Sequence, residues 1–364
     1  MKTRSHCRLS ARSFCALHAS RVALAVLVCA GWNAAGAATL CVTNGDVAGL
    51  QSALATAAGN GEDDLIELQQ GQYPMPSNFV LSYQAVTEHH DITIEGGYSA
   101  NFGNDCATPP ASPDARNTVL DGGLWRLHLA PGVGSLKLKS VTLQSTFSVD
   151  AAHAPIEIGA DINSTGNIAI ENVIFLNNGS STAPAVYLLA GSAAVFVQNS
   201  LFAGNVTFGQ SNAVLIGSRR FSAFGDLIVN STFSGNASSL PALDVYTPNS
   251  SAIVANDILW GNTGGDVVFS NPPSSYVLND DFGDLLEAGG TQSANLVSVD
   301  PLFKPDFSLD DLSPLRDKGN TGSAIFSPGL FDVAGLPRVY HNEKPDIGAF
   351  EIQEVIFASG VDFN

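Results

Sequence analysis

The stretch Asn199-Ser-Leu-Phe-Ala-Gly-Asn205 is one of four copies of a seven-residue pattern in the middle of this chain of 364 residues. The pattern reads Asn-x-x-Phe/Leu-x-x-Asn, and the other copies are Asn172-Val-Ile-Phe-Leu-Asn-Asn178, Asn230-Ser-Thr-Phe-Ser-Gly-Asn236 and Asn256-Asp-Ile-Leu-Trp-Gly-Asn262. Successive copies start 27, 31 and 26 residues apart, and a weaker copy, Ser140–Thr146, starts 32 residues before the first. A period of nearly 30 residues indicates a repeat protein, in which each unit packs against the next.

Each repeat contains about three short β-prone runs. One run, such as Ala194-Val-Phe-Val-Gln198, precedes each copy of the pattern, and another, such as Ala185-Val-Tyr-Leu-Leu189, lies between copies. Gly, Asn, Ser and Pro separate the runs, and no stretch of helical period lies between them. The runs are too short for a membrane barrel, and the repeat is too short for a propeller blade. One turn of a three-faced parallel β-helix fits both the length and the strand count.

Stacked coils place equivalent side chains in columns about 4.8 Å apart. We therefore expect Phe175, Phe202, Phe233 and Leu259 to form one inward file. Asparagine tolerates left-handed turn geometry, and stacked Asn amides can hydrogen-bond from coil to coil. This explains both Asn positions of the pattern as structural turn residues. They are Asn172, Asn178, Asn199, Asn205, Asn230, Asn236, Asn256 and Asn262.

The ends of a solenoid expose strand edges, which must be covered. Residues 47–58 have the pattern of an amphipathic helix that ends at Asn60-Gly61, and the first predicted strand, 64–68, follows it. From Val299 onward the chain is richer in Pro and Asp, which predicts an irregular C-terminal cap. The predicted fold is all-β, a right-handed parallel β-helix with a short N-terminal capping helix. The expected segments are a signal peptide (1–37), the N-terminal cap and first coils (38–110), the β-helix coils (111–295), the C-terminal cap (296–351) and a tail (352–364).

The first 37 residues have the features of a secretory signal peptide. Basic residues precede the apolar run Val22–Ala30, and Ala35-Gly36-Ala37 matches a signal-peptidase site. No apolar run is long enough to span a bilayer, so we expect no transmembrane anchor. The protein is then secreted, periplasmic or on the cell surface.

Removal of residues 1–37 takes five of the 16 basic residues and none of the 34 acidic ones, which leaves 11 against 34 and a net charge of −23. So acidic a surface repels nucleic acid and anionic membranes. It could attract Ca²⁺ weakly, although no cofactor is required. Solubility outside the cell explains the charge equally well.

Two cysteines, Cys41 and Cys106, remain after removal of the signal peptide. An even pair in an exported chain predicts one disulfide, and the alternative is two free thiols. The bond would close a loop of about 65 residues and stabilise the fold by roughly 4 kcal/mol in the chain-entropy model.

Both ends of the chain resemble known β-helix proteins. Cys41-Val-Thr, Asn60–Leu68, Gly71-Gln-Tyr73, Glu95-Gly-Gly-Tyr98 and Cys106 resemble the start of secreted right-handed β-helix proteins of the pectin-lyase-like superfamily. Near the other end, six elements are similar to the closing signature of the "choice-of-anchor Q" proteins. They are Asp300-Pro-Leu-Phe303, Asp306-Phe-Ser-Leu309, Ser313-Pro314, Asp317-Lys-Gly319, Leu336-Pro-Arg338 and Asp346-Ile-Gly-Ala-Phe-Glu351.

This resemblance covers nearly the whole chain after residue 37. It implies a bacterial, exported β-helix protein, and most members of that family have no established activity. The tail is similar to short sorting tails ending in a Phe-x-x-Gly-Phe type of motif, but it departs from the motif at Val361. It has no apolar helix followed by basic residues, so we expect no sortase or membrane anchor.

Catalytic candidates are few. A polysaccharide lyase needs an Arg or Lys base, and Arg219-Arg220 is a basic pair between two strands, where a solvated loop is the alternative. A glycoside hydrolase needs two carboxylates, which Asp280-Asp281 with nearby Asp284 could supply. The Gly-His-Gly and Arg-Ile-Lys elements of polygalacturonases are absent.

Other polar clusters have simpler explanations. His89-His90-Asp91 has no third ligand at a zinc-like spacing. Glu62-Asp63-Asp64 and Asp310-Asp311 could bind Ca²⁺ weakly, but turn and capping roles account for them. Tyr187, Tyr246 and Trp260 could line a face that stacks on sugars, or they could simply pack.

We therefore expect an exported, non-catalytic β-helix that presents a surface for a carbohydrate or a cell-surface glycan. The alternatives are a polysaccharide lyase or glycoside hydrolase acting on an acidic polysaccharide, and an adhesin-like structural protein. Basic and acidic side chains meeting in one groove would favour the enzyme. A face of stacked polar residues with scattered aromatics would favour binding.

Overall fold

The computed structural model describes residues 37–85, 89–99, 106, 113–129, 134–220, 225–270, 274–283, 291–321, 328–339 and 344–353. The chain divides into two units, residues 1–37 and 38–364, and only the second is treated below. The predicted signal peptide, apart from Ala37, and the tail after Gln353 lie outside the described residues.

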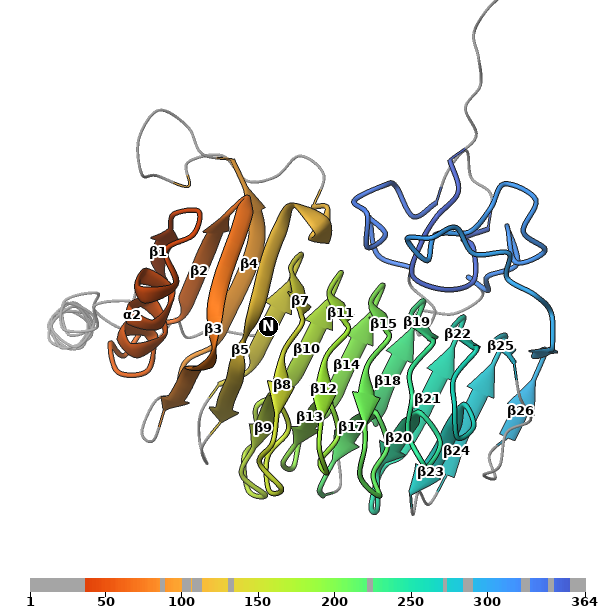
Figure 1. Cartoon of the computed structure of the whole chain (residues 1–364), viewed down its shortest axis with the longest axis horizontal. Helices are drawn as coiled ribbons and strands as arrows, with labels where there is room; N and C mark the ends of the chain where they lie inside the picture. Colours follow the sequence, from red (N-terminus) through yellow and green to blue (C-terminus); the bar gives the residue numbers. More distant parts are fainter. Residues whose placement is uncertain are drawn as a thin grey trace, which may run out of the picture. The chain divides into compact units, whose positions relative to one another are not determined.

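The second unit is a parallel β-helix built from three parallel sheets (Figure 1). Sheet A has ten strands, in the order β1 (Ala38–Val42), β2 (Asp64–Gln69), β4 (Ile92–Tyr98), β6 (Leu136–Lys139), β10 (Ile168–Glu171), β14 (Val195–Gln198), β18 (Asp226–Val229), β21 (Ser251–Ala255), β24 (Ser274–Leu278) and β26 (Thr291–Ser293). Each coil contributes one strand to this sheet, so residues that are one repeat apart in the sequence lie side by side. The predicted fold class is confirmed.

Sheet B has 14 strands and two halves, which join at the long strands β3 (Gly71–Ala85) and β5 (Thr118–Leu129). The first half holds β7 (Thr142–Gln144), β11 (Ile174–Leu176), β15 (Leu201–Ala203), β19 (Thr232–Ser234), β22 (Ile258–Trp260), β25 (Asp281–Phe282) and β27 (Leu296–Val297). The second half holds β9 (Ile156–Ala160), β13 (Val186–Ala190), β17 (Val214–Ser218), β20 (Leu243–Tyr246) and β23 (Val267–Ser270). Sheet C is small, with β8 (Phe147–Ser148), β12 (Gly179–Ser180) and β16 (Val206–Thr207).

The phenylalanine of each repeat lies in the core. Phe175 pairs with Phe202, Phe202 with Phe233 and Phe233 with Leu259, and all four side chains are fully buried. The ring centroids of Phe175 and Phe202 are 4.7 Å apart, and those of Phe202 and Phe233 are 4.6 Å apart. The spacing of the stacked rings is the rise of one coil.

The two asparagines of each repeat do different things. The first one, as in Asn199, has a positive φ of 49°, the left-handed conformation that turns the chain from sheet A into sheet B. The second is buried and forms a ladder, in which Asn205 Nδ2 donates to Asn236 Oδ1 at 3.0 Å and Asn236 Nδ2 donates to Asn262 Oδ1 at 3.1 Å. The ladder ends where Asn262 Nδ2 donates to the Asp266 carboxylate at 2.9 Å.

The N-terminal end is covered by helix α2 (Val47–Ala57). The Asp46 side chain caps it by accepting a hydrogen bond from the Gly49 N–H at 2.7 Å. Leu50 and Leu54 are fully buried and belong to the main core. The Cys41–Cys106 disulfide is present, as predicted, and joins strand β1 to the segment that follows β4.

The C-terminal segment, residues 300–353, is irregular and lies along the side of several coils (Figure 1, blue). Asn172 Nδ2 donates to the Phe331 carbonyl at 3.0 Å, and Asn199 Nδ2 donates to the Pro328 carbonyl at 2.8 Å. Farther along the β-helix, Thr232 Oγ1 accepts from the Ala349 N–H at 2.9 Å. The segment therefore runs along the β-helix instead of covering only its last coil.

Within the described ranges, no helix is both long enough and apolar enough to cross a membrane.

Candidate functional site

A set of polar and aromatic side chains lies on the outer face of the second half of sheet B. We call this surface the Tyr187 face. Its side chains point outward because they alternate with inward residues, such as Ile156 and Ile158, which are fully buried. Strand pairing arranges them in two columns. They are Arg126, Glu157, Tyr187, Leu215 and Asp244 in one column, and His128, Gly159, Leu189, Gly217 and Tyr246 in the other.

A tyrosine and an arginine meet at the centre of this face. Arg219 comes directly after strand β17, and its Nη2 donates to the Tyr187 hydroxyl at 2.9 Å. A Cβ atom added to Gly159 would lie 3.9 Å from Tyr187 Cε1 and from His128 Nδ1. Gly159 therefore lies between the ring of Tyr187 and that of His128, which are neighbours on this face. Tyr246 is half-buried two coils farther along the same face.

Two charged clusters flank Tyr187. Glu157 Oε2 lies 3.1 Å from His153 Nδ1 and 3.9 Å from Arg126 Nε. Asp161 Oδ1 lies 3.0 Å from His128 Nε2. Burial lowers the pKa of the Arg126 guanidinium, although Glu157 acts in the opposite direction. Both acids thus already have partners.

The state of Tyr187 limits its chemistry. Burial raises the pKa of its phenol above the ordinary value, even though the Arg219 charge acts to lower it. The phenol is therefore protonated at neutral pH, when it can donate and accept hydrogen bonds but cannot act as a base.

A second candidate site is a hollow of about 430 Å³ on sheet A, at the ends of β4, β6 and β10. Its polar lining includes Glu95, Tyr98, Lys139 and Glu171. Lys139 Nζ is 2.8 Å from Glu95, and Lys137 Nζ is 3.1 Å from Glu171. Each carboxylate is thus paired with a lysine. The pairing engages the carboxylates and the amines that a catalytic step would use.

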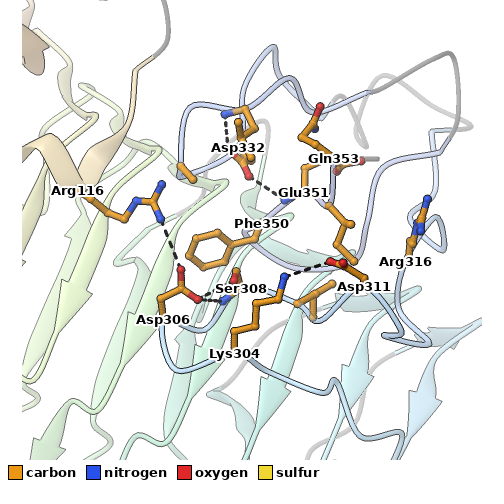
Figure 2. Close-up of a pocket in the computed structure, with 14 residues that line it drawn as sticks. Arg116, Lys304, Asp306, Ser308, Asp311, Arg316, Asp332, Phe350, Glu351 and Gln353 are labelled. Atoms are coloured by element: carbon orange, nitrogen blue, oxygen red, sulfur yellow. Dashed lines mark hydrogen bonds and ion pairs between the residues drawn. The ribbon is translucent and has the colours of Figure 1, made fainter. Parts of the chain in front are cut away.

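A third candidate site is a hollow of about 870 Å³ within the C-terminal segment and against Arg116 (Figure 2). We call it the charged hollow. Its wall is held by the buried Arg338, whose Nη2 donates to the Asp346 carbonyl at 2.8 Å and whose Nη1 lies 3.7 Å from Glu351 Oε2. Asp332 accepts a hydrogen bond from the Glu351 N–H at 2.8 Å. Burial raises the pKa of Asp332 to about 6 and that of Glu351 to about 8, although the Arg338 guanidinium acts to lower both. Burial also raises the pKa of Asp346, which faces the same guanidinium.

The structure separates the catalytic candidates found in the sequence. Arg219 and Arg220 are both exposed, and Arg219 contacts Tyr187 on the Tyr187 face. Asp280 and Asp281 are fully buried, and Asp280 Oδ1 accepts from the Asp257 N–H at 2.7 Å inside the turn between sheets A and B. Asp284 lies outside the described residues. The pair therefore lines no open groove.

Of the three aromatics, Tyr187 and Tyr246 share one face, but Trp260 does not. Trp260 lies on the first half of sheet B and packs against Leu309, Leu315 and Ile347 beneath the C-terminal segment.

The remaining polar clusters act within the fold. His90 Nδ1 lies 3.4 Å from Asp63, and Asp91 accepts from the Ser135 N–H at 2.7 Å. Asp310 accepts from the Leu312 N–H at 3.0 Å, and Asp311 pairs with Lys304 at 3.2 Å. Among the described residues, no group of three or more potential ligands is arranged to hold a metal ion.

Sequence reasoning missed four residues of the Tyr187 face: Arg126, His128, Glu157 and Asp161. A signal was available, because Trp125-Arg126-Leu127-His128-Leu129 alternates apolar and polar residues, the pattern of a half-buried strand.

Comparison with known proteins finds no match: no family model, no curated protein and no solved structure is similar to the chain at a significant level.

Proposed function

We propose that the Tyr187 face binds a glycan chain without cleaving it. The observation that carries this proposal is the hydrogen bond between Arg219 and Tyr187, which holds an aromatic ring and a guanidinium side by side on the outer face of sheet B. Aromatic rings stack on the apolar faces of sugars, and arginine donates several hydrogen bonds in a fixed geometry. Tyr246 and Arg126, on other coils, extend the same surface along the β-helix.

The geometry favours binding over catalysis. The Tyr187 phenol is protonated at neutral pH, and both Glu157 and Asp161 have histidine partners. A glycosidase needs one carboxyl group as acid and a second that is free to act as nucleophile or base. Coils rise by about 4.8 Å, which is close to the length of one sugar residue in an extended chain. A chain lying along the axis would then meet one coil per sugar.

Binding can be tested with the chain from Ala38 onward and a panel of neutral and acidic polysaccharides, by affinity gel electrophoresis and calorimetry. Tyr187→Ala should weaken binding of the retained polysaccharide roughly tenfold, because it removes the ring. Arg219→Gln should weaken binding by about fivefold. Tyr276→Ala and Lys137→Gln, on sheet A, are the matched controls and should bind normally. Retention that all four variants preserve equally would refute the Tyr187 face as the site.

The enzymatic alternative is favoured by the hollow on sheet A, where Lys139 lies between Glu95 and Glu171 in the strand register. The same polysaccharides should be incubated with the protein and Ca²⁺ and followed by ultraviolet absorbance and by reducing ends. We expect no product. Turnover abolished by Lys139→Met would establish the lyase or hydrolase instead, and turnover abolished in an Arg219→Ala/Arg220→Ala double variant would place it on the Tyr187 face.

We infer in addition that the protein is exported and related to the choice-of-anchor Q proteins of the pectin-lyase-like superfamily. The disulfide supports export, because such bonds persist outside the cytoplasm. The closing-signature residues Arg338, Asp346 and Glu351 support the relation, since they meet in one buried cluster. An adhesin-like role is tested by adding whole cells to the same binding experiment. An adhesin would bind the cells as well as the soluble polysaccharide.

A further inference from the structure

A smaller apolar slot adjoins the charged hollow under the C-terminal segment. The two cavities share Arg116, Asp306 and Phe350 in their walls, and the slot has a volume of about 200 Å³. Its apolar lining includes Ile174, Leu176 and Leu201 from strands β11 and β15, with Phe307 and Phe350 from the C-terminal segment. Thr142 and Gln144 of strand β7 add two polar side chains to the wall.

The slot has the size and the surface for one aromatic ring. An engineered apolar cavity of about 150 Å³ is enough to hold benzene. Ile174 and Leu201 lie on paired strands and are only 4% and 2% exposed, so this wall is rigid. Phe307 and Phe350 add aromatic edges, against which another ring packs favourably.

Arg116 presents a guanidinium nitrogen at the mouth of this slot. Its Nε and Nη2 bind the Asp114 carboxylate, each at 2.9 Å, which fixes the plane of the guanidinium. The remaining nitrogen, Nη1, lies 3.6 Å from Asp306, which is too far for a hydrogen bond (Figure 2).

Asp306 does not depend on that contact. Its Oδ1 accepts hydrogen bonds from Ser308 Oγ at 2.6 Å and from the Ser308 N–H at 3.2 Å. Asp306 and Arg116 are both about half exposed, so their mutual attraction is weak. Another carboxylate can therefore replace Asp306 at Nη1 without leaving a buried charge unpaired.

We propose that this composite site binds a small aromatic carboxylate, with the ring in the apolar slot and the carboxylate on Arg116 Nη1. The ring is held by Leu176, Leu201 and Phe350, and Lys304, whose exposed partner Asp311 is 3.2 Å away, supplies a second cation in the adjoining hollow. The site is separate from the Tyr187 face and does not rest on the glycan proposal.

The probe is phenylacetate, titrated into the chain from Ala38 onward and followed by calorimetry and by saturation-transfer NMR. We expect millimolar binding, with saturation transferred mainly to the ring protons. Phenylacetamide, which lacks the charge, should bind about threefold to fivefold more weakly, the range that a half-exposed ion pair contributes. Acetate, which lacks the ring, should show no binding.

Two pairs of variants separate the site from non-specific adsorption. Leu176→Phe fills the slot and should weaken phenylacetate binding by about tenfold or more, whereas Leu227→Phe, at a half-buried leucine on sheet A, should leave it unchanged. Arg116→Gln should reduce the preference for phenylacetate over phenylacetamide to near unity, and Arg219→Gln should not. Thermal unfolding of each variant verifies that it is folded. Absence of saturation transfer from the parent protein to phenylacetate, or equal affinity in Leu176→Phe, would overturn the proposal.

Discussion

Four hydrogen bonds meet at the side chain of Asn205. Its Oδ1 accepts from the Asn178 N–H at 3.2 Å and from Asn178 Nδ2 at 3.0 Å, and its Nδ2 donates to the Phe175 carbonyl and to Asn236 Oδ1, both at 3.0 Å. The side chain is fully buried, so water cannot replace these partners. Asn205 thus fastens three successive coils at one corner.

Asn205→Ala should destabilise the protein by roughly 3–5 kcal/mol, because it leaves several buried donors and acceptors without partners. The measurement is the free energy of unfolding in urea, followed by circular dichroism. Asn163→Ala, at an exposed asparagine, is the control and should change this free energy by less than about 0.5 kcal/mol. A loss no larger than that of the control would show that the ladder does not stabilise the coils.

The sequence could predict the first asparagine of each repeat as a turn residue because its backbone conformation is a local property. The positive φ of Asn172, Asn199, Asn230 and Asn256 depends only on the residue and its turn. The contact between Tyr187 and Arg219 could not be predicted in the same way. Those residues are 32 positions apart, and the unequal repeat lengths hide which side chains share a face.

At the scale of elements, the C-terminal segment behaves as a separate layer on the β-helix. It has no repeat and, among the described residues, no regular strand, and it is held by side chains of the coils and by its own buried Arg338 cluster. Sequence composition predicted that this segment is irregular. The sequence could not predict the path of this segment over the coils, because an aperiodic stretch carries no pattern that indicates which coils it contacts.

Arg338→Met should release this layer from the coils. Removal of the guanidinium leaves the Asp332, Asp346 and Glu351 carboxyl groups buried without a cation, a change that typically costs about 3–5 kcal/mol. Hydrogen exchange should then increase in residues 300–353 while amides of strands β10 to β17 stay protected. Lys344→Met, at an exposed lysine, should leave exchange unchanged. Uniform loss of protection throughout the β-helix would contradict a separate layer.

At the scale of the whole molecule, buried acids make stability depend on pH. Burial raises the pKa of Asp226 and Asp332 to about 6, of Asp281 to about 7 and of Glu351 to about 8. In the unfolded chain these groups titrate near pH 4. The folded protein therefore holds protons that the unfolded chain has lost, and its stability should fall as pH rises from about 4 to about 8.

The urea midpoint, measured between pH 5 and pH 9, should decrease steadily over this window. Asp280→Asn should reduce the slope, because burial holds the pKa of Asp280 well above its ordinary value and the amide oxygen can still accept from the Asp257 N–H. Asp310→Asn, at a half-buried position next to a turn, should keep the original slope apart from any small constant offset. A midpoint that rises with pH would mean that these carboxyl groups are ionised in the folded state.

The C-terminal segment also restricts the number of coils that the β-helix can have. Solenoids commonly gain or lose whole repeats, since each unit touches only its neighbours. Here one aperiodic stretch binds Asn172 with Phe331, Thr232 with Ala349 and Asn256 with Asn320. Excision of a single turn, for example residues 172–198, would preserve the register of the sheets yet leave these anchor points too close together. Lineages of this protein should therefore tolerate substitutions on the coils far more readily than tandem duplications or deletions between residues 172 and 279.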